Sequence, residues 1–417
     1  MRRWLTVFLL AAALVIAYVD RTNLSVALAA AEFKQYFHFS DEQRGFLNSA
    51  FFWSYTLLQI PAGFVIDRFG VKRPIAVALF FWCLASAATS VATLLGQLIA
   101  LRLLLGVAEA VVFPAGLSWI HRNIDEERRG LAAALFVGGT KWGPALGAPL
   151  AAWLVGHYGW RIMFQVVGLG GLIWVVPWVL LADDGASAPK RVRQAGGTVP
   201  IAALFRSKII WGTLVGTFCY NYFLFFSITW LPAYFVERRH LSLDSMGVYT
   251  FFSFAGTGVV AILAGAAADW LIAGGANAAA VRRGFTIAGL LAASTEVIGA
   301  LSDSNQVAVF FAIFSMAGLG LATPNYWTLT QTLVTRTAAG RVAGLQNTAL
   351  NLAGIVAPIL TGWLKQVTGS YTAPMQAIWV TLIVGIGAYL FLVRRGETDA
   401  VLSGRREKTA LASSSAE

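Results

Sequence analysis

Charged residues are scarce in this sequence, and the scarcity decides the class of protein. Asp, Glu, Lys and Arg together make up 12% of the 417 residues, whereas hydrophobic residues make up 58%. A soluble domain carries about 25% charged residues, which help to cover its surface. A chain this apolar has too few charges to do so, and we therefore expect it to lie in a lipid bilayer.

The residues that build catalytic and metal sites are also in short supply. Cys83 and Cys219 both lie in apolar runs, and the four histidines form no cluster. No metal-ligand spacing, nucleotide-binding loop or nucleophile–histidine–acid set occurs, so we predict no enzyme, no metal and no organic cofactor. The net charge of +11 comes from short basic groups between apolar runs, a pattern of membrane topology that argues against nucleic acid as a partner.

What the sequence does contain is a series of long apolar runs. A helix needs about 20 apolar residues to cross a bilayer, and continuous runs exclude the alternating strands of a barrel. Arg2 and Arg3 before the first run also suit a signal peptide cleaved at Ala29–Ala31, but Asp20 and Arg21 interrupt that run and favour a membrane helix. The twelve predicted spans are near 5–30, 43–66, 74–94, 96–120, 130–155, 160–182, 207–236, 244–271, 284–301, 306–335, 340–365 and 372–393.

The loops between these spans divide by charge. Lys and Arg gather on the side of the N-terminus, which predicts a multi-pass protein of a cell membrane, the bacterial inner membrane, with both termini in the cytoplasm. The basic residues on the opposite side are Lys34, Arg44, Arg161, Arg238, Arg239 and Lys365.

The predicted fold class is an all-α integral membrane protein whose twelve transmembrane helices form two six-helix bundles. A polar stretch at 183–206 serves as a cytoplasmic linker between the bundles at 1–182 and 207–395, and 396–417 reads as a disordered cytoplasmic tail. Six helices followed by six, with a site at the midplane between the halves, is an architecture of transporters.

One loop carries a specific motif. The stretch 63–73, GFVIDRFGVKR, matches the signature G-x-x-x-D-R-x-G-x-K/R-R, and the chain resembles the major facilitator superfamily there. The resemblance implies two bundles that gate through charge pairs at the cytoplasmic face. A counterpart ends the eighth span, where Trp270 replaces the basic residue that often follows the acid. The gating residues implied are Gly63, Asp67, Arg68, Gly70, Lys72, Arg73 and Asp269.

Further segments resemble the anion:cation symporter branch of that superfamily, which includes hexuronate and galactonate transporters. They are Tyr18–Ser25, Arg102 with Gly106, Glu109 and Pro114, Arg128–Gly130, Gly159–Arg161 and Thr229–Pro232.

Five formal charges stand inside predicted spans, at Asp20, Arg21, Arg102, Glu109 and Lys141. Because lipid penalises a charge by roughly 2.5–3.5 kcal/mol, we expect these residues to face a cavity or one another. Arg102 and Glu109, seven positions apart, share a helix face. A guanidinium group binds a carboxylate through two hydrogen bonds, which makes Arg21 and Arg102 anchors for an anionic substrate.

The carboxyl groups of Asp20 and Glu109 suit proton coupling. Burial favours the protonated form of a carboxyl group and a nearby arginine favours the ionised form, so arrival of an anion changes the balance. The resemblance implies the same roles for these four residues. The alternative is that they form structural ion pairs between helices, and that Lys141 snorkels to the membrane surface.

Other polar and aromatic residues extend this candidate site. The resemblance implies substrate contacts for Tyr18, Tyr55 and the region of Thr140. Trp327, Asn347 and Asn351 interrupt apolar spans, and buried amides need hydrogen-bond partners, which a polyhydroxylated ligand would supply. Packing of the aromatic rings and hydrogen bonds between helices remain the alternatives.

The predicted function is proton-coupled symport of a small organic anion, a sugar acid such as a hexuronate or aldonate, by alternating access. The predicted partners are that anion, protons and the bilayer, and the chain is predicted to be a monomer. The alternative is an organic-phosphate or drug antiporter or exporter of the same superfamily.

Overall fold

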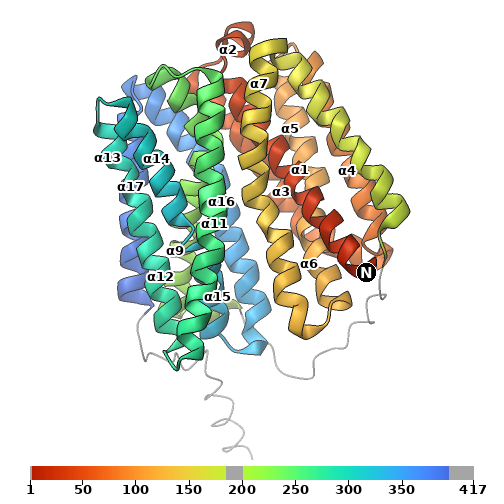
Figure 1. Ribbon diagram of the computed structural model, residues 1–417, viewed down its shortest axis with the longest axis vertical. Coiled ribbons are helices and arrows are strands. Elements are labelled where there is room, and N and C mark those ends of the chain that lie inside the picture. Colours follow the sequence, from red (N-terminus) through yellow and green to blue (C-terminus); the bar gives the residue numbers. More distant parts are fainter. Residues whose placement is uncertain (1, 185–200, 394–417) are drawn as a thin grey trace, which may run out of the picture. The chain divides into compact units, whose positions relative to one another are not determined.

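The computed structural model describes residues 2–184 and 201–393, and within these ranges the secondary structure is helical with no strand (Figure 1). In the first part of the chain the helices are α1 (Arg2–Ala29), α2 (Ala31–Phe37), α3 (Asp41–Phe69), α4 (Lys72–Ala88), the 3-10 turn η1 (Thr89–Val91), α5 (Leu95–Glu109), α6 (Val112–Asn123) and α7 (Glu126–Leu181). In the second part they are α8 (Ile201–Leu204), α9 (Lys208–Thr229), α10 (Leu231–Ala233), the π-helix η2 (Tyr234–Arg238), α11 (Leu243–Ala273), α12 (Ala278–Ser294), α13 (Glu296–Leu301), α14 (Asn305–Leu319), α15 (Thr323–Leu333), α16 (Arg336–Thr368), α17 (Thr372–Gly387) and the π-helix η3 (Ala388–Leu392).

Among the described residues, 11 helical segments are long and apolar enough to cross a membrane. The longest, α7, has 56 residues, but its helix is interrupted at Gly159, where φ is 81° and ψ is 165°. At 1.5 Å per residue α7 would measure about 84 Å if straight, far more than a bilayer core of about 30 Å. Gly159 therefore separates two crossings, and the predicted fold of twelve membrane helices is confirmed.

The chain forms two compact units. Unit 1 comprises Met1–Val192, Phe225–Ala255 and Gly354–Pro374, and unit 2 comprises the rest. Four helices, α9, α11, α16 and α17, contribute residues to both units. The boundaries of the two predicted six-helix bundles stay a prediction. The tail at 396–417 lies outside the described residues, as does most of the linker at 183–206.

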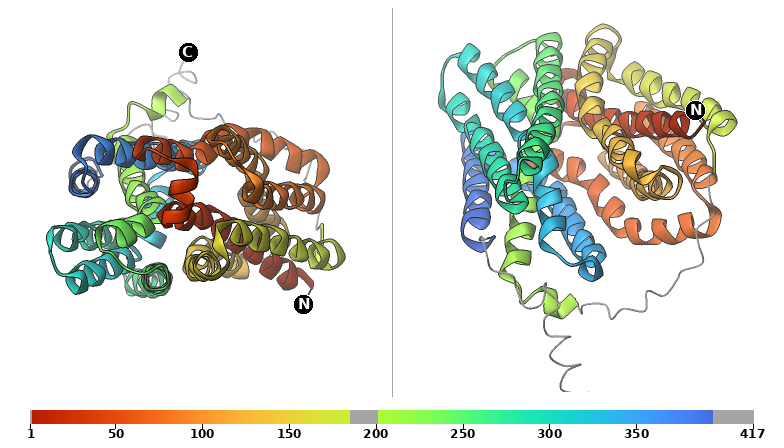
Figure 2. Two further views of the ribbon diagram at one scale, coloured as in Figure 1. Left: turned by 90° about the horizontal axis from the view of Figure 1, so that it is seen from above. Right: turned by 60° about the horizontal axis from the view of Figure 1, so that its bottom comes forward.

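Close approach of α1 and α7 organises the centre of unit 1, and Figure 2 shows the two helices side by side from two further directions. A Cβ atom at Gly143 would lie 2.9 Å from the carbonyl oxygen of Val15 and would collide with Tyr18. One at Gly147 would lie 3.0 Å from Cα of Val19. Because no side chain separates the backbones here, α7 holds in place the segment of α1 that leads into Asp20 and Arg21.

Unit 2 has a buried polar cluster of its own. The side-chain amide of Gln346 on α16 donates hydrogen bonds to Thr217 Oγ1 on α9 at 2.9 Å and to Thr330 Oγ1 on α15 at 3.0 Å. All three side chains are fully buried. These bonds tie three membrane helices together where lipid offers no competing donor or acceptor.

Candidate functional site

Arg21 on α1 and Glu109 on α5 form a buried ion pair in unit 1. Both Nη2 and Nε of Arg21 contact Glu109 Oε2, at 2.9 Å and 3.0 Å. The other carboxylate oxygen, Oε1, is buried and has no hydrogen-bond partner among the described residues. Glu109 Oε2 thus makes both contacts with Arg21, and Oε1 is available to bind a proton or to accept a further hydrogen bond.

Aromatic rings surround the guanidinium group of Arg21. Its Cζ lies 4.3 Å from the ring centroid of Tyr18, 4.4 Å from that of Phe51 and 4.9 Å from that of Tyr55. Such cation–π contacts hold a planar cation that has been withdrawn from water. Tyr18 and Tyr55 were expected at the site, whereas Phe51 gave no signal, because a phenylalanine in an apolar span is unremarkable.

Asp20 makes a separate set of contacts. Its Oδ1 accepts a hydrogen bond from Ser86 Oγ on α4 at 2.6 Å and a long one from Asn23 Nδ2 at 3.5 Å. Its Oδ2 is buried without a hydrogen-bond partner in the described part of the chain. Arg102 binds the backbone carbonyl of Asp20 at 3.3 Å. The two predicted carboxyl groups therefore have different surroundings, one facing a cation and the other a hydroxyl group.

A small pocket opens between Arg21 and Arg102. Its volume is about 20 Å³, which is room for one water molecule and far below the roughly 300 Å³ of a typical ligand site. Two arginines and two polar side chains make it a site for an anion, although the pocket must widen to admit an organic one. Its lining comprises Arg21, Leu24, Asn48, Phe51, Phe52, Arg102, Phe225, Ile228 and Thr229.

Thr140 and Lys141 lie on α7. Thr140 is half-buried, and Lys141 is only 7% exposed, which argues against an ammonium group that snorkels to the surface. Neither residue lines the small pocket. Their contact with a substrate stays a prediction.

Trp327, Asn347 and Asn351 lie in unit 2, on α15 and α16. The amide of Asn351 donates to the backbone carbonyl of Asn347 at 2.9 Å, and its Oδ1 is buried without a hydrogen-bond partner among the residues the structure describes. Trp327 and Asn347 are half-buried. That these residues share one chamber with Arg21 and Arg102 stays a prediction.

The motif loop joins α3 to α4. Arg122 of α6 pairs with Asp67 at 3.1 Å, and Gly70 takes a φ of 75°, which favours glycine. Asp184 accepts a hydrogen bond from the backbone N–H of Lys72 at 2.9 Å, so the end of the sixth span also braces the loop. The sequence did not single out Asp184, because an acid after a span is common.

The other residues of the predicted gate in unit 1 make fewer contacts. The guanidinium group of Arg68 lies 5.4 Å from the ring of Phe69, Arg73 is exposed, and a Cβ atom at Gly63 would meet nothing within 4 Å. In unit 2, Asp269 pairs with Arg282 Nη2 at 2.9 Å. Asp269 therefore has a cationic partner although Trp270 replaces the basic residue that often follows the acid, and α12 supplies the cation.

Glu237, on the π-helix η2, sits among four donors that we call the carboxylate seat: Lys34, Arg44, Lys365 and Tyr371. Lys34 Nζ lies 2.7 Å and Arg44 Nη2 2.9 Å from Glu237 Oε1. Lys365 Nζ at 2.9 Å and the Tyr371 hydroxyl at 2.8 Å approach Oε2. All five residues belong to unit 1, at the end where α2 lies, which we call the α2 end (Figure 1).

These contacts determine the charge of Glu237. Burial raises its pKa, but the charges of Arg44 and Lys365 outweigh burial, hydrogen bonds from the two lysines add to them, and the pKa falls from 4.5 to about 2. The carboxylate therefore stays ionised across the physiological range.

Glu237→Gln is expected to destabilise the protein in a pH-dependent way. A pKa lowered on folding adds stability above pH 4.5 that disappears as the pH falls towards 2, and a shift of this size corresponds to on the order of 3 kcal/mol. Melting temperatures in detergent should differ most at pH 6–7 and converge below pH 4.5. A gap that stays constant down to pH 3 would contradict the assignment.

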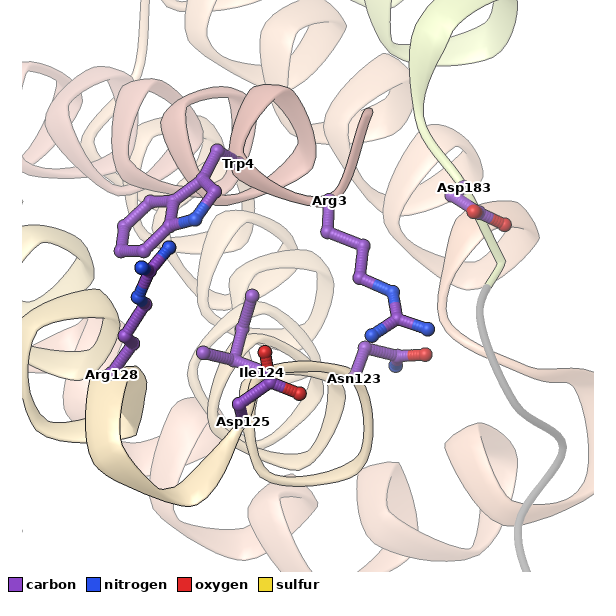
Figure 3. A pocket seen from close by; sticks show the side chains of 7 residues that line it. All are labelled: Arg3, Trp4, Asn123, Ile124, Asp125, Arg128 and Asp183. Carbon is purple, nitrogen blue, oxygen red and sulfur yellow. The ribbon is translucent and has the colours of Figure 1, made fainter. Parts of the chain in front are cut away.

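A larger pocket of about 400 Å³ lies in unit 1 near the N-terminus (Figure 3). Arg3 and Trp4 come from α1, whereas the residues below them come from the end of α6, the turn that follows and the start of α7, namely Asn123, Ile124, Asp125 and Arg128. The lining contains two arginines and two aspartates, Asp125 and Asp183, so its formal charges cancel and it has no net preference for an anion. Its Arg128 and Asp125 side chains are exposed. None of the five buried charges that the sequence singles out lines this pocket.

Among the described residues, no group of three or more His, Cys, Asp or Glu side chains is placed to hold a metal ion.

Comparison with known proteins adds the family context. Residues 10–358 match the model of the Major Facilitator Superfamily. A D-galactonate transporter of Escherichia coli is 30% identical, with 96% of this chain and 97% of the relative covered. A probable galactarate/D-glucarate transporter of Bacillus subtilis is 28% identical, with 94% and 92% covered.

A hexuronate transporter of Bacillus subtilis is also 28% identical, over 86% of this chain and 87% of the relative. Among solved structures, a bacterial homologue of the human lysosomal transporter Spinster matches with a TM-score of 0.79, covering 94% of this chain and 97% of that one. Its identity of 17% makes this a likeness of fold alone.

Proposed function

Because the chain belongs to the Major Facilitator Superfamily, we propose that it carries a sugar acid, such as a hexuronate or aldonate, across the membrane together with protons. The family and the relatives' names identify a transporter and not an enzyme, as the sequence predicted. Those names, galactonate, galactarate or glucarate and hexuronate, share one chemistry, a polyhydroxylated chain with at least one carboxylate group.

The observation that carries the proposal is the buried pair of Arg21 and Glu109 beside Arg102. A buried cation without its counter-ion is costly, so a nearby carboxylate stabilises Arg21. Glu109 supplies one in the empty protein. When the acid's carboxylate arrives, Glu109 becomes redundant, and a proton on its open Oε1 oxygen cancels its charge. Anion and proton then bind together.

Asp20 offers a second proton position with a different partner. Its contact with Ser86 is a hydroxyl hydrogen bond, which survives protonation of the carboxyl group, since a hydroxyl group both donates and accepts. Arg102 donates a hydrogen bond to the backbone carbonyl of Asp20, not to its carboxyl group, and its side chain lines the small pocket, where it can bind an anion. We assign the acid's carboxylate to Arg21 and Arg102, and protons to Glu109 and Asp20.

Orientation belongs to the same proposal. The motif loop and both termini are placed in the cytoplasm of a bacterial cell, on the basic side of the loops. The α2 end then faces the outside. Transport by alternating access opens the α2 end and the motif-loop end in turn, with protons as the coupling ion.

A transport assay in proteoliposomes tests the proposal. A panel of labelled hexuronates, aldonates and aromatic acids is offered with and without an inward proton gradient. Uptake of a sugar acid that rises with the gradient is the expected result. Flux that ignores the gradient and follows a counter-substrate would instead establish the antiporter.

Arg102→Ala is expected to weaken binding of the transported acid about 10- to 100-fold, because a charge-assisted hydrogen bond of roughly 1.5–3 kcal/mol is lost. Equilibrium binding to purified protein measures the change directly. Arg128→Ala, which removes an exposed arginine of α7, is the matched control. Equal affinities for the two variants would remove Arg102 from the site.

A further inference from the structure

The carboxylate seat at the α2 end has the composition of a binding site for an organic acid. It presents three cations and a hydroxyl group to one carboxylate, through four contacts of 2.7–2.9 Å. Arg44 is 3% exposed as a side chain, so this carboxylate is recognised largely out of water. An isolated ion pair at a protein surface contributes little to stability, whereas several charges in one partly buried network contribute more.

The positive charges of the carboxylate seat exceed the negative charges of the acids that contact it. Asp41 is the second acid of the cluster, and its Oδ1 lies 2.7 Å from both Arg44 Nη1 and Lys365 Nζ. Three cations and two carboxylates leave one net positive charge. Without the carboxylate of Glu237 the cluster carries two, which makes the vacated position strongly attractive to an anion.

The seat is connected along one face of α3 to the small pocket between Arg21 and Arg102, which we call the inner pocket. Residues 44, 48, 51 and 55 are spaced by four, three and four, so their side chains share that face. Arg44 belongs to the seat, Asn48 and Phe51 line the inner pocket, and Tyr55 stacks on Arg21. Seven residues of helix from Arg44 to Phe51 span about 10 Å.

The segment at the end of α9 also connects the carboxylate seat to the inner pocket. The ring of Trp230 lies 4.8 Å from Cζ of Arg44 and 5.8 Å from Nζ of Lys365, and its indole N–H donates to the carbonyl of Pro358 at 3.1 Å. The preceding residue, Thr229, lines the inner pocket. Seat and pocket are therefore neighbours on both α3 and the end of α9.

We propose that the carboxylate seat is an outer anion site, which the transported acid occupies after displacing Glu237 and before reaching the inner pocket. Glu237 acts as a tethered carboxylate that fills the seat when no acid is present. The identity of the acid rests on the proposed function, whereas the existence of a carboxylate site does not.

Chemical rescue of Glu237→Ala tests the existence of the site without any transport assay. At pH 7, sodium acetate should raise the melting temperature of the purified variant in a saturable way, and neutral acetamide should not. The wild-type protein, whose seat is filled, should not respond. Arg238→Ala removes an exposed charge of the same π-helix and should not respond either. A Glu237→Ala protein that is as stable as wild type, or that ignores acetate, overturns the proposal.

Two further variants make the test specific. Adding Arg44→Gln to Glu237→Ala should abolish the response to acetate, because the most buried cation of the seat is lost. If Glu237→Ala cannot be purified, Glu237→Gln replaces it, and acetate should then compete for a seat held only by a neutral amide. Rescue that persists without Arg44 places the acetate elsewhere and refutes the site.

The role in transport is tested with galactonate in place of acetate. Arg102→Ala is combined with Glu237→Ala to weaken the inner pocket, and galactonate, but not galactose, should still raise the melting temperature. Rescue by acetate but not by galactonate would show a carboxylate site that the acid does not use, and would overturn the outer-site role. Failure of sugar-acid uptake by the wild type, with acetate rescue intact, would instead count against the proposed function.

Discussion

Glu109→Gln is expected to abolish accumulation of the transported acid against its gradient while leaving exchange intact. A difference of one pH unit stores about 1.4 kcal/mol per proton, which supports about a tenfold accumulation for each proton carried. Glutamine keeps the volume of Glu109 and an oxygen that accepts from Arg21 Nε, but it carries no exchangeable acid proton. The variant should therefore equilibrate the acid to the outside concentration and stop there.

The measurement needs two assays on the same proteoliposomes. Gradient-driven uptake reports coupling, and counterflow of labelled acid at equal pH reports binding and movement of the binding site without net proton transfer. Glu126→Gln, an exposed carboxyl group at the start of α7, is the control and should behave as wild type in both. If the Glu109 variant accumulates the acid fully, the coupling role falls; if it loses counterflow as well, Glu109 serves structure or binding instead.

The charged residues of this site were predictable because a charged side chain is energetically unfavourable in lipid. Asp20, Arg21, Arg102 and Glu109 interrupt apolar spans, and a charge there calls for a partner or a cavity. The structure supplies both, as a buried ion pair and a pocket between two arginines.

The partners of those residues were not predictable. Ser86 and Phe51 touch Asp20 and Arg21, yet a serine or a phenylalanine in a membrane helix carries no signal by itself. Only the packing of α3 and α4 against α1 selects them. The spacing of Arg102 and Glu109 predicts a shared helix face, but it does not predict their separate contacts, which Arg102 makes with the Asp20 backbone and Glu109 with Arg21.

The carboxylate seat was missed for a different reason. Its members look like ordinary loop charges, and Lys34 and Glu237 stand 203 positions apart in the chain. The distribution of Lys and Arg places Lys34, Arg44 and Lys365 on one side of the membrane, but it does not predict which side chains they contact. Nothing in a single sequence pairs such residues, since the pairing depends on how α2, α3, η2 and α16 meet.

Arg21→Lys is expected to reduce kcat/KM for the acid about 30-fold, although the positive charge is retained. Lysine lacks the planar fork that places Nε and Nη2 together on Glu109, and its ammonium group does not stack between the rings of Tyr18 and Phe51. Loss of one charge-assisted hydrogen bond and part of the cation–π contact amounts to about 2 kcal/mol. The same loss should weaken equilibrium binding of the acid.

The matched control for this exchange is Arg161→Lys. Arg161 also stacks on two rings, with Cζ 4.6 Å from the Tyr36 centroid and 4.4 Å from that of Trp160, but it is exposed and does not line the inner pocket. A loss of stacking alone would affect both variants, whereas loss of a substrate anchor affects only Arg21→Lys. Wild-type transport by Arg21→Lys would mean that a point charge suffices at this position, and the acid would then be held by Arg102 without the paired geometry proposed for Arg21.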